Sequence, residues 1–348
     1  MRIYRYIPII LLGLVLSCIS PLDLKIDEED KLLVMEGYIT TLPGPHFIRL
    51  TTSAKYGSVF EGQIKPEPGA DIWIRDELGN ITELIDNDFG NYQTPSNFKG
   101  EVGKTYVLNI ITARGEEYSS LPETILPAPK VDSLYYLFKR LLTEDPLDYK
   151  AGVEIYGLWQ DPAEERNFYM WRNNGVYNVN TFPENYEIPG VFPRVAAPKD
   201  CCDECWVTET NGDKDINIYN DLNTNGATNS QLMAFIEDDG KRYMDTYQIT
   251  IQQLSISKGA YAFFNLLRSQ KSINGDIFDP PPATIRGNII KLDDPETNVI
   301  GYFYASDVKE INHFIERTEL EGIQSPDIIN DDCRVLRGAS TLKPSNWE

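Results

Sequence analysis

Residues 153–172 read Val-Glu-Ile-Tyr-Gly-Leu-Trp-Gln-Asp-Pro-Ala-Glu-Glu-Arg-Asn-Phe-Tyr-Met-Trp-Arg, and this stretch decides the class of fold. Every second residue from Val153 to Trp159 is apolar or glycine, which is the period of a half-buried β-strand. Residues 161–167 are polar and turn-forming, and residues 168–172 resume the strand pattern. The stretch therefore predicts an antiparallel strand, turn and strand.

Toward the N-terminus, the same kind of pattern repeats in short segments separated by Gly, Pro and Asn. The segments are 34–39, 47–51, 70–75, 81–84, 91–92, 106–111 and 117–118. Many short strands at such spacing predict an antiparallel sandwich. We expect residues 32–128 to form an immunoglobulin-like or carboxypeptidase-regulatory-like β-sandwich. Residues 122–129 contain three prolines and predict a stiff linker.

Toward the C-terminus, residues 130–348 predict a larger β-rich domain with one helix. Strands are expected at 247–256, 285–290 and 299–306. Residues 258–271 have apolar side chains on one helical face, and Ser257 is a suitable N-cap. Residues 173–200 lack a sustained period and are rich in Pro, Asn and aromatic residues, which predicts a long ordered loop. The predicted fold class is mainly β.

The N-terminal residues predict export and lipidation. A basic start with Arg2 and Arg5 precedes a short apolar run, and Val15-Leu16-Ser17-Cys18 fits a lipobox. Signal peptidase II would remove residues 1–17 and leave Cys18 to carry acyl chains. Residues 18–31 predict a polar tether. No second apolar stretch approaches membrane-spanning length.

The chain is strongly acidic, with a formal net charge of -21. Loss of Arg2 and Arg5 with the signal peptide would change this to -23. So acidic a protein repels nucleic acid and anionic lipid surfaces, so contact with the membrane is expected only through the lipid anchor.

Four cysteines remain once Cys18 is lipidated: Cys201, Cys202, Cys205 and Cys333. An even number in an exported protein favours disulfides. The CxxC spacing also suits zinc, but a closed site would need all four thiolates. Of the three pairings that four cysteines allow, we expect at least one disulfide between the 201–205 cluster and Cys333.

Several motifs, each weak alone, together resemble a family of uncharacterised lipoproteins from Bacteroidota. They include Gly-Ala-Asp-Ile-Trp-Ile at 69–74, Cys-Cys-Asp-Glu-Cys-Trp at 201–206, and Phe-Asp-Pro-Pro-Pro at 278–282. The family commonly has a second cysteine just upstream of Cys333, where this chain has Asn330-Asp331-Asp332. The resemblance implies an outer-membrane lipoprotein of a kind that often accompanies TonB-dependent transporters. It carries over no catalytic residues.

Catalytic, metal and cofactor sites are not predicted. His46 and His313 lie in no metal-ligand spacing, and no nucleophile elbow occurs. The acidic pairs Glu164-Glu165 and Asp238-Asp239 are expected to be solvated surface residues. Residues 211–217 alternate oxygen-bearing side chains that could suit Ca²⁺, but they depart from a calcium loop at later positions.

The aromatic residues of the expected long loop are the candidate binding residues: Tyr177, Phe182, Tyr186 and Phe192. Aromatic residues among Asn and Pro could form a platform for sugar rings or a peptide, or cover the mouth of a transporter. The alternative is that they pack onto the second domain and hold the loop in place.

These observations favour a non-enzymatic, outer-membrane lipoprotein that binds a ligand or acts as an accessory partner of a TonB-dependent transporter. One alternative is a secreted-type hydrolase whose carboxylate pair is assembled only by the fold. Another alternative is a structural envelope module, for which the expected fixed-period repeats do not occur in the sequence.

Overall fold

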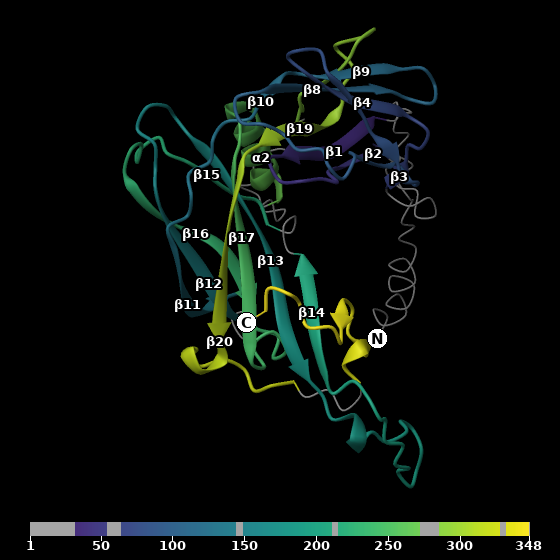
Figure 1. Ribbon diagram of the computed structural model, residues 1–348, viewed down its shortest axis with the longest axis vertical. Helices are drawn as coiled ribbons and strands as arrows, with labels where there is room; N and C mark the ends of the chain where they lie inside the picture. Colours follow the sequence, from purple (N-terminus) through teal and green to yellow (C-terminus); the bar gives the residue numbers. More distant parts are fainter. Residues whose placement is uncertain are drawn as a thin grey trace, which may run out of the picture.

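The computed structural model describes residues 32–53, 64–143, 149–210, 215–271, 285–327 and 332–347. Within these residues the chain forms four β-sheets and one α-helix, arranged as two sandwiches (Figure 1). The predicted mainly β fold is confirmed. The expected signal peptide (1–17) and the Cys18 tether (18–31) lie outside the described residues.

The first sandwich packs two sheets face to face. Ile48 and Leu50 of one sheet and Leu108 and Ile110 of the other are fully buried between them. One sheet has the order β19-β1-β2-β7-β6, with β3 beside β2. The other has the order β18-β9-β8-β4-β5, with β10 beside β8. Their strands are β1 (Leu33–Thr40), β2 (Phe47–Ser53), β3 (Ile64–Pro66), β4 (Asp71–Asp76), β5 (Ile81–Glu83), β6 (Ile85–Asp86), β7 (Asn91–Gln93), β8 (Thr105–Ile111), β9 (Glu117–Ser120), β10 (Glu123–Thr124), β18 (Ile289–Lys291) and β19 (Ile300–Ser306).

The second sandwich pairs a three-stranded sheet, β11-β12-β16, with a sheet of order β20-β17-β13-β14-β21. Trp159 fills the space between them, with its ring 5.7 Å from that of Tyr169 and 5.6 Å from that of Trp171. Both sheets thus bury one face. The strands are β11 (Ser133–Leu142), β12 (Tyr149–Gln160), β13 (Phe168–Asn180), β14 (Glu204–Thr210), β15 (Asn217–Asn220, beside β13), β16 (Thr228–Glu237), β17 (Thr246–Ser255), β20 (Val308–Glu316) and β21 (Ala339–Ser340).

A late segment of the chain completes the first sandwich. β19 pairs with β1 in parallel over seven residues, from Val34 opposite Ile300 to Thr40 opposite Ser306. Gly301 has a φ of +111°, and a Cβ there would lie 1.7 Å from the Met35 carbonyl oxygen. The close approach of the two strands therefore requires glycine at this position. β18 similarly pairs with β9.

Asp307 joins the two sandwiches at the point where β19 passes into β20. Its side chain is almost fully buried, and its Oδ1 accepts a hydrogen bond from Thr41 Oγ1 at 2.7 Å. Its Oδ2 accepts a hydrogen bond from the backbone N–H of Ala128 at 2.9 Å and pairs with Lys309 Nζ at 3.0 Å. One carboxylate thus fixes the end of β1, the inter-sandwich linker and the start of β20.

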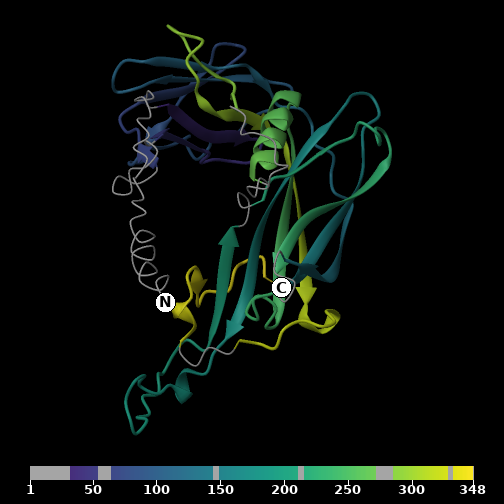
Figure 2. The ribbon, with the colours of Figure 1, turned by 180° about the vertical axis from the view of Figure 1, so that it is seen from behind.

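The helix α2 (Lys258–Lys271) fills the corner between the sandwiches, as Figure 2 shows from behind. Its range matches the prediction, and Ser257 Oγ accepts from the Ala260 N–H at 3.1 Å as an N-cap. The Phe263 ring lies 5.3 Å from that of Tyr302 on β19, and Tyr261 lies 5.1 Å from Phe168 on β13. No helix among the described residues is long and apolar enough to cross a membrane.

The division between the sandwiches differs from the expected division into 32–128 and 130–348. The chain does leave the first sandwich near residue 128, but β18 and β19 return to it. The expected linker also contains β10, and Gln253 Nε2 of β17 donates to the Pro129 carbonyl at 2.8 Å. The linker is therefore held by both sandwiches.

Glu123 of β10 predicts a pH dependence of stability. Its carboxyl is buried and accepts from the Tyr302 hydroxyl at 2.6 Å, and burial raises its pKa above the ordinary value. Glu123 has its ordinary pKa in the unfolded chain and a higher pKa in the folded chain. Between these two pKa values, the folded chain binds more protons than the unfolded chain. The contribution of Glu123 to stability therefore falls as pH rises through this window.

We expect Glu123→Gln to become more stable relative to the wild type as pH rises from about 4 toward neutrality. Denaturant unfolding at a series of pH values measures this difference. Glu117→Gln, at an exposed position on β9, is the control and should leave the pH profile unchanged. A constant difference between wild type and Glu123→Gln at every pH would contradict the assignment.

Candidate functional site

A long segment between β13 and β14 projects from the second sandwich, at the bottom of Figure 1. We call this segment, residues 181–203, the arm. The expected loop of 173–200 begins too early, because residues 173–180 extend β13 and pair with both β14 and β17. The arm lies at the opposite end of the molecule from the first sandwich (Figures 1 and 2).

Internal hydrogen bonds hold the two sides of the arm together. The Ile188 N–H donates to the Val195 carbonyl at 2.9 Å, and the Ala197 N–H donates to the Tyr186 carbonyl at 2.9 Å. At the base, the Thr181 N–H donates to the Asp203 carbonyl at 2.7 Å. The short 3₁₀ helix η2 (Pro183–Asn185) lies between base and tip. The arm is therefore an ordered irregular hairpin.

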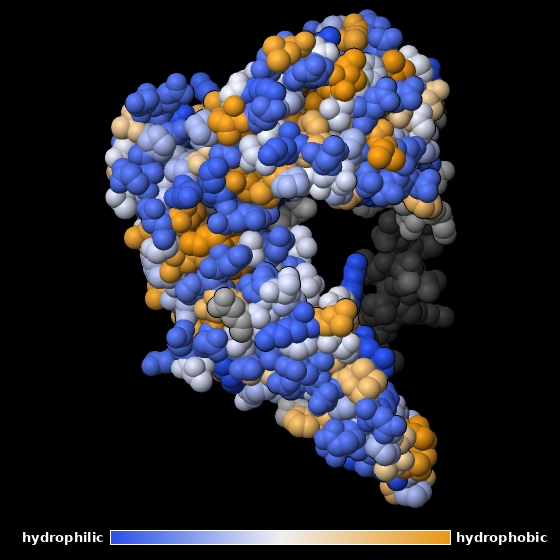
Figure 3. Space-filling view, viewed as in Figure 1, coloured by the Kyte–Doolittle hydropathy of each residue, from blue (hydrophilic) through white to orange (hydrophobic). Residues whose placement is uncertain are grey.

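The tip of the arm exposes apolar side chains. Phe192 is 96% exposed, and Ile188, Val191 and Val195 are each more than 40% exposed. Figure 3 shows orange, hydrophobic residues gathered at the end of the projection. Clustered exposed apolar residues on an ordered protrusion are typical of an interaction surface.

The four predicted aromatic residues occupy three different environments. Tyr177 lies on β13 and is buried, with its ring 6.1 Å from that of Tyr247, so it belongs to the core. Tyr186 is half-buried beneath Lys199, whose Nζ lies 4.3 Å from the ring centroid. Of the four predicted residues, Phe182 and Phe192 are the two that are exposed on the arm.

The cysteines lie at the base of the arm. Cys205 forms a disulfide with Cys333 across 128 residues, which confirms the expected link between the cluster and Cys333. Cys201 and Cys202 are free thiols, so the structure does not place all four cysteines in disulfides. The Cys333 N–H donates to the Cys202 carbonyl at 2.9 Å. The disulfide therefore fastens the C-terminal segment, with η4 (Cys333–Val335), against the root of the arm.

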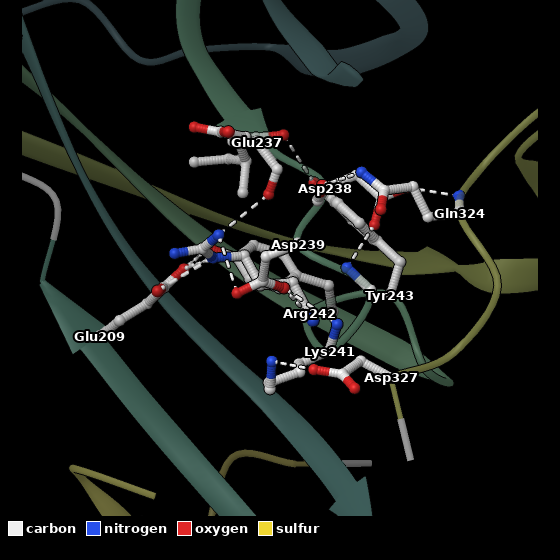
Figure 4. A network of polar contacts seen from close by, with 12 residues as sticks. Glu209, Glu237, Asp238, Asp239, Lys241, Arg242, Tyr243, Gln324 and Asp327 are labelled. Carbon is white, nitrogen blue, oxygen red and sulfur yellow. Dashed lines mark hydrogen bonds and ion pairs between the residues drawn. The ribbon is translucent and has the colours of Figure 1, made fainter. Parts of the chain in front are cut away.

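A partly buried ion pair, with the Arg242 side chain 19% and the Glu209 side chain 15% exposed, lies in the second sandwich (Figure 4). Arg242 Nε donates to Glu209 at 2.9 and 3.0 Å, and its Nη1 donates to the Glu237 carbonyl at 3.0 Å. Asp239 pairs with the same guanidinium at 3.2 Å, and the Tyr247 hydroxyl donates to Glu209 at 2.8 Å. We call Arg242, Glu209, Asp239 and Tyr247 the Arg242 cluster.

The surroundings of Glu209 raise the pKa values of two tyrosines and of Arg242. Burial raises the pKa of Tyr177 to about 12, and the Glu209 carboxylate adds to this effect. The same two causes raise the pKa of Tyr247. Burial opposes the charge of Arg242, but the Glu209 carboxylate outweighs it and raises the arginine pKa. The tyrosines therefore stay neutral and Arg242 stays charged.

The adjacent acidic residues Asp238 and Asp239 have separate structural roles. Asp238 is buried, and its Oδ2 accepts from the Gln324 N–H at 2.7 Å, while Gln324 Nε2 donates to the Asp238 carbonyl at 2.7 Å. The prediction that Asp238 is a solvated surface residue is therefore wrong, whereas Glu164 and Glu165 are exposed as predicted. Neighbouring Lys241 pairs with Asp327 (Figure 4).

The remaining candidates show no assembled chemistry in the described residues. No group of three or more His, Cys, Asp or Glu is placed to hold a metal ion there. Of the calcium-like segment, residues 211–214 lie outside the described part. His46 is buried and His313 is half-buried, and removal from solvent lowers the pKa of each. An open hollow of about 880 Å³ lies on the first sandwich, but its Lys104 is already paired with Glu101 at 2.7 Å.

Comparison with known families matches residues 19–312 to the family described as Domain of unknown function (DUF4249). The chain belongs to this family. No curated protein matches the sequence. The DUF4249 match includes the first sandwich, most of the second, the arm and the Arg242 cluster, whereas the end of β20, Cys333 and β21 lie beyond it.

Sequence reasoning missed the Arg242 cluster in this DUF4249 protein. Arg242 and Glu209 are 33 residues apart and fall in no motif. The available signal was Gly175, where a Cβ would lie 1.9 Å from the Tyr247 hydroxyl oxygen. A glycine inside a strand pattern indicates such a close approach, but it does not identify the approaching group.

We expect Arg242→Met to destabilise the protein by about 1–3 kcal/mol, because it removes a charged donor from the partly buried Glu209 carboxylate. The double variant Arg242→Met with Glu209→Met should recover part of this loss. Arg286→Met, which breaks an exposed pair with Glu296, is the control and should cost less than about 1 kcal/mol. Equal losses for the Arg242 and Arg286 variants in denaturant unfolding would contradict the assignment of a partly buried pair.

Proposed function

We propose that this DUF4249 protein is an outer-membrane lipoprotein that acts as an accessory partner of a TonB-dependent transporter. The arm is the docking element, and the exposed apolar tip around Phe192 is the observation that carries the proposal. Exposed aromatic residues on an ordered protrusion supply contact area with little loss of conformational entropy on binding.

The N-terminal motif supports membrane attachment. Val15-Leu16-Ser17-Cys18 has the features of a lipobox, and the acyl chains on Cys18 would hold the protein at a membrane. Residues 18–31, the proposed tether, precede β1 in the sequence. The protein would then be confined to two dimensions with its partner, which raises their effective concentration.

The surface chemistry of the arm favours a protein partner over an anionic membrane or a nucleic acid. The chain carries a net charge of -21, so anionic membranes and nucleic acids are repelled. The arm tip instead offers Phe192, Val191 and Val195, which an apolar surface of a partner would cover. The resemblance to lipoproteins that accompany TonB-dependent transporters supports the choice of this partner class.

Replacing Phe192 and Val191 together by Ser should reduce co-purification with the transporter at least tenfold. Both side chains are exposed, so the thermal unfolding midpoint should stay within about 1 °C of the wild type. The measurement is mass spectrometry of proteins recovered with the tagged chain from mildly solubilised native membranes, scored for transporter peptides.

Phe89→Ser is the matched control, because Phe89 is 77% exposed but lies on the first sandwich. This variant should recover the transporter as well as the wild type does. Undiminished recovery with the Phe192 and Val191 variant would remove the arm tip from the interface. Absence of any TonB-dependent transporter from the wild-type sample would refute the proposed partner.

Cys18→Ser should prevent lipidation and move the protein out of the membrane fraction, because no other acylation site is proposed. Cys201→Ser is the control, since Cys201 is an exposed free thiol in the structure. Fractionation and metabolic labelling with a fatty acid decide the question. Unchanged membrane retention and labelling of Cys18→Ser would rule out the lipoprotein assignment.

A further inference from the structure

A small cavity lies beside the Arg242 cluster, between the two sheets of the second sandwich. Its volume is about 180 Å³, well below the roughly 300–1,000 Å³ of pockets for drug-sized ligands. At about 30 Å³ of liquid volume per water molecule, it has room for on the order of six water-sized groups. The cavity therefore suits one compound of a few heavy atoms.

Asn173 provides an acceptor in this cavity that has no donor. The side chain is only 7% exposed, and its Oδ1 makes no hydrogen bond. Buried polar atoms in folded proteins nearly always have a partner, so this oxygen indicates a missing N–H or O–H group. A strand interior would otherwise favour an apolar residue at this inward position, like its neighbour Trp171.

Asn173 lies on β13 close to the start of β15, where Trp171 pairs with Asn217. Along one side of β13, pairing with β15 ends at Trp171 and pairing with β14 begins at Asn174. Asn173 lies between these two partner strands. Asp215, just before β15, and Asn217 at its start line the same cavity.

Charges of both signs surround the cavity. Lys150 of β12 and Arg242 provide the cations, and Asp215 and Glu237 provide the carboxylates. Arg242 uses Nε and Nη1 for Glu209, Asp239 and the Glu237 carbonyl (Figure 4), and no hydrogen bond of its Nη2 is found in the described part of the chain. Within these residues, the Lys150 and Asp215 side chains also have no ion pair, so both charges remain available to a ligand.

We propose that this cavity binds a small zwitterion, a free α-amino acid with a short side chain. Its ammonium group would donate to Asn173 Oδ1 and pair with Asp215. Its carboxylate would accept hydrogen bonds from Lys150 Nζ and Arg242 Nη2. This assignment goes beyond docking by the arm, and the two can fail separately because the arm contributes no residue to the cavity.

Charge balance favours a zwitterion over an ion of a single sign. The two cations and two carboxylates of the lining cancel, and Arg242 is already paired with Glu209 and Asp239. A simple anion would leave Asn173 Oδ1 without a donor, and a simple cation would leave Lys150 unpaired. A ligand with both groups pairs Lys150 and Asp215 and also gives Asn173 Oδ1 a donor.

The test is calorimetric titration and thermal unfolding of the full-length protein in detergent with glycine, L-alanine, L-serine and L-threonine. At least one should bind and raise the unfolding midpoint. Its N-acetyl and methyl ester forms should each bind at least tenfold more weakly, because each lacks one charge. Binding of D-glucose without binding of any amino acid would overturn the proposal.

Lys150→Met and Asp215→Asn should each weaken binding of that amino acid at least tenfold. Lys139→Met and Asp132→Asn, at exposed positions elsewhere on the same sandwich, are the matched controls and should bind as the wild type does. Equal affinity of the wild type and the two cavity variants would overturn the proposal.

Asn173→Leu separates a binding role from a structural one. Leucine has a similar size and no unpartnered oxygen, so the unliganded variant should unfold at the same temperature as the wild type or higher. Its midpoint should no longer respond to the amino acid. A lower midpoint of the unliganded variant would mean that Asn173 supports the fold, and the proposal would fail.

Discussion

The parallel pairing of β1 with β19 holds the two sandwiches together in one structure. It joins the first strand of the described chain to a strand 266 residues later in the sequence, with Thr40 opposite Ser306 at one end of the pairing. β19 passes within one residue into β20, which pairs with β17 at the centre of the second sandwich. The two sandwiches therefore share one continuous segment, and neither is a self-contained stretch of sequence.

Buried polar groups fix this shared segment in position. Asp307 binds the end of β1 and the linker with one carboxylate, and Arg172 of β13 stacks 3.9 Å from the Tyr38 ring of β1. Because buried charges are stable only with their partners, these contacts select one arrangement of the sandwiches. The consequence for function is a stiff body that carries the arm at one end of its long axis and the first sandwich at the other (Figure 1).

The sequence predicted what depends on local pattern. Alternation from Val153 to Trp159 lies within β12, and the apolar face of 258–271 with Ser257 as cap gives α2. The sequence did not predict that β19 pairs with β1 of the first sandwich. The alternation of apolar and polar residues indicates a strand, but it does not indicate which distant strand is its partner. The aromatic residues of 173–200 had the same sequence pattern and were all predicted to lie in one loop. Because β13 extends to Asn180, Tyr177 is buried in the strand, whereas Phe192 is exposed at the tip of the arm. The contacts of Arg242 could not be predicted for the same reason, since they join residues of the two sheets.

The most direct test is the folding of residues 32–128 as an isolated fragment. Without β19, β1 loses one neighbour, and the buried Phe303 and Ala305 no longer cover the core of the first sandwich. We expect circular dichroism of this fragment to show no cooperative thermal transition. Joining residues 285–306 to the fragment by a flexible linker should restore the transition. A cooperative transition of the 32–128 fragment alone would contradict the central role of the β1–β19 pairing.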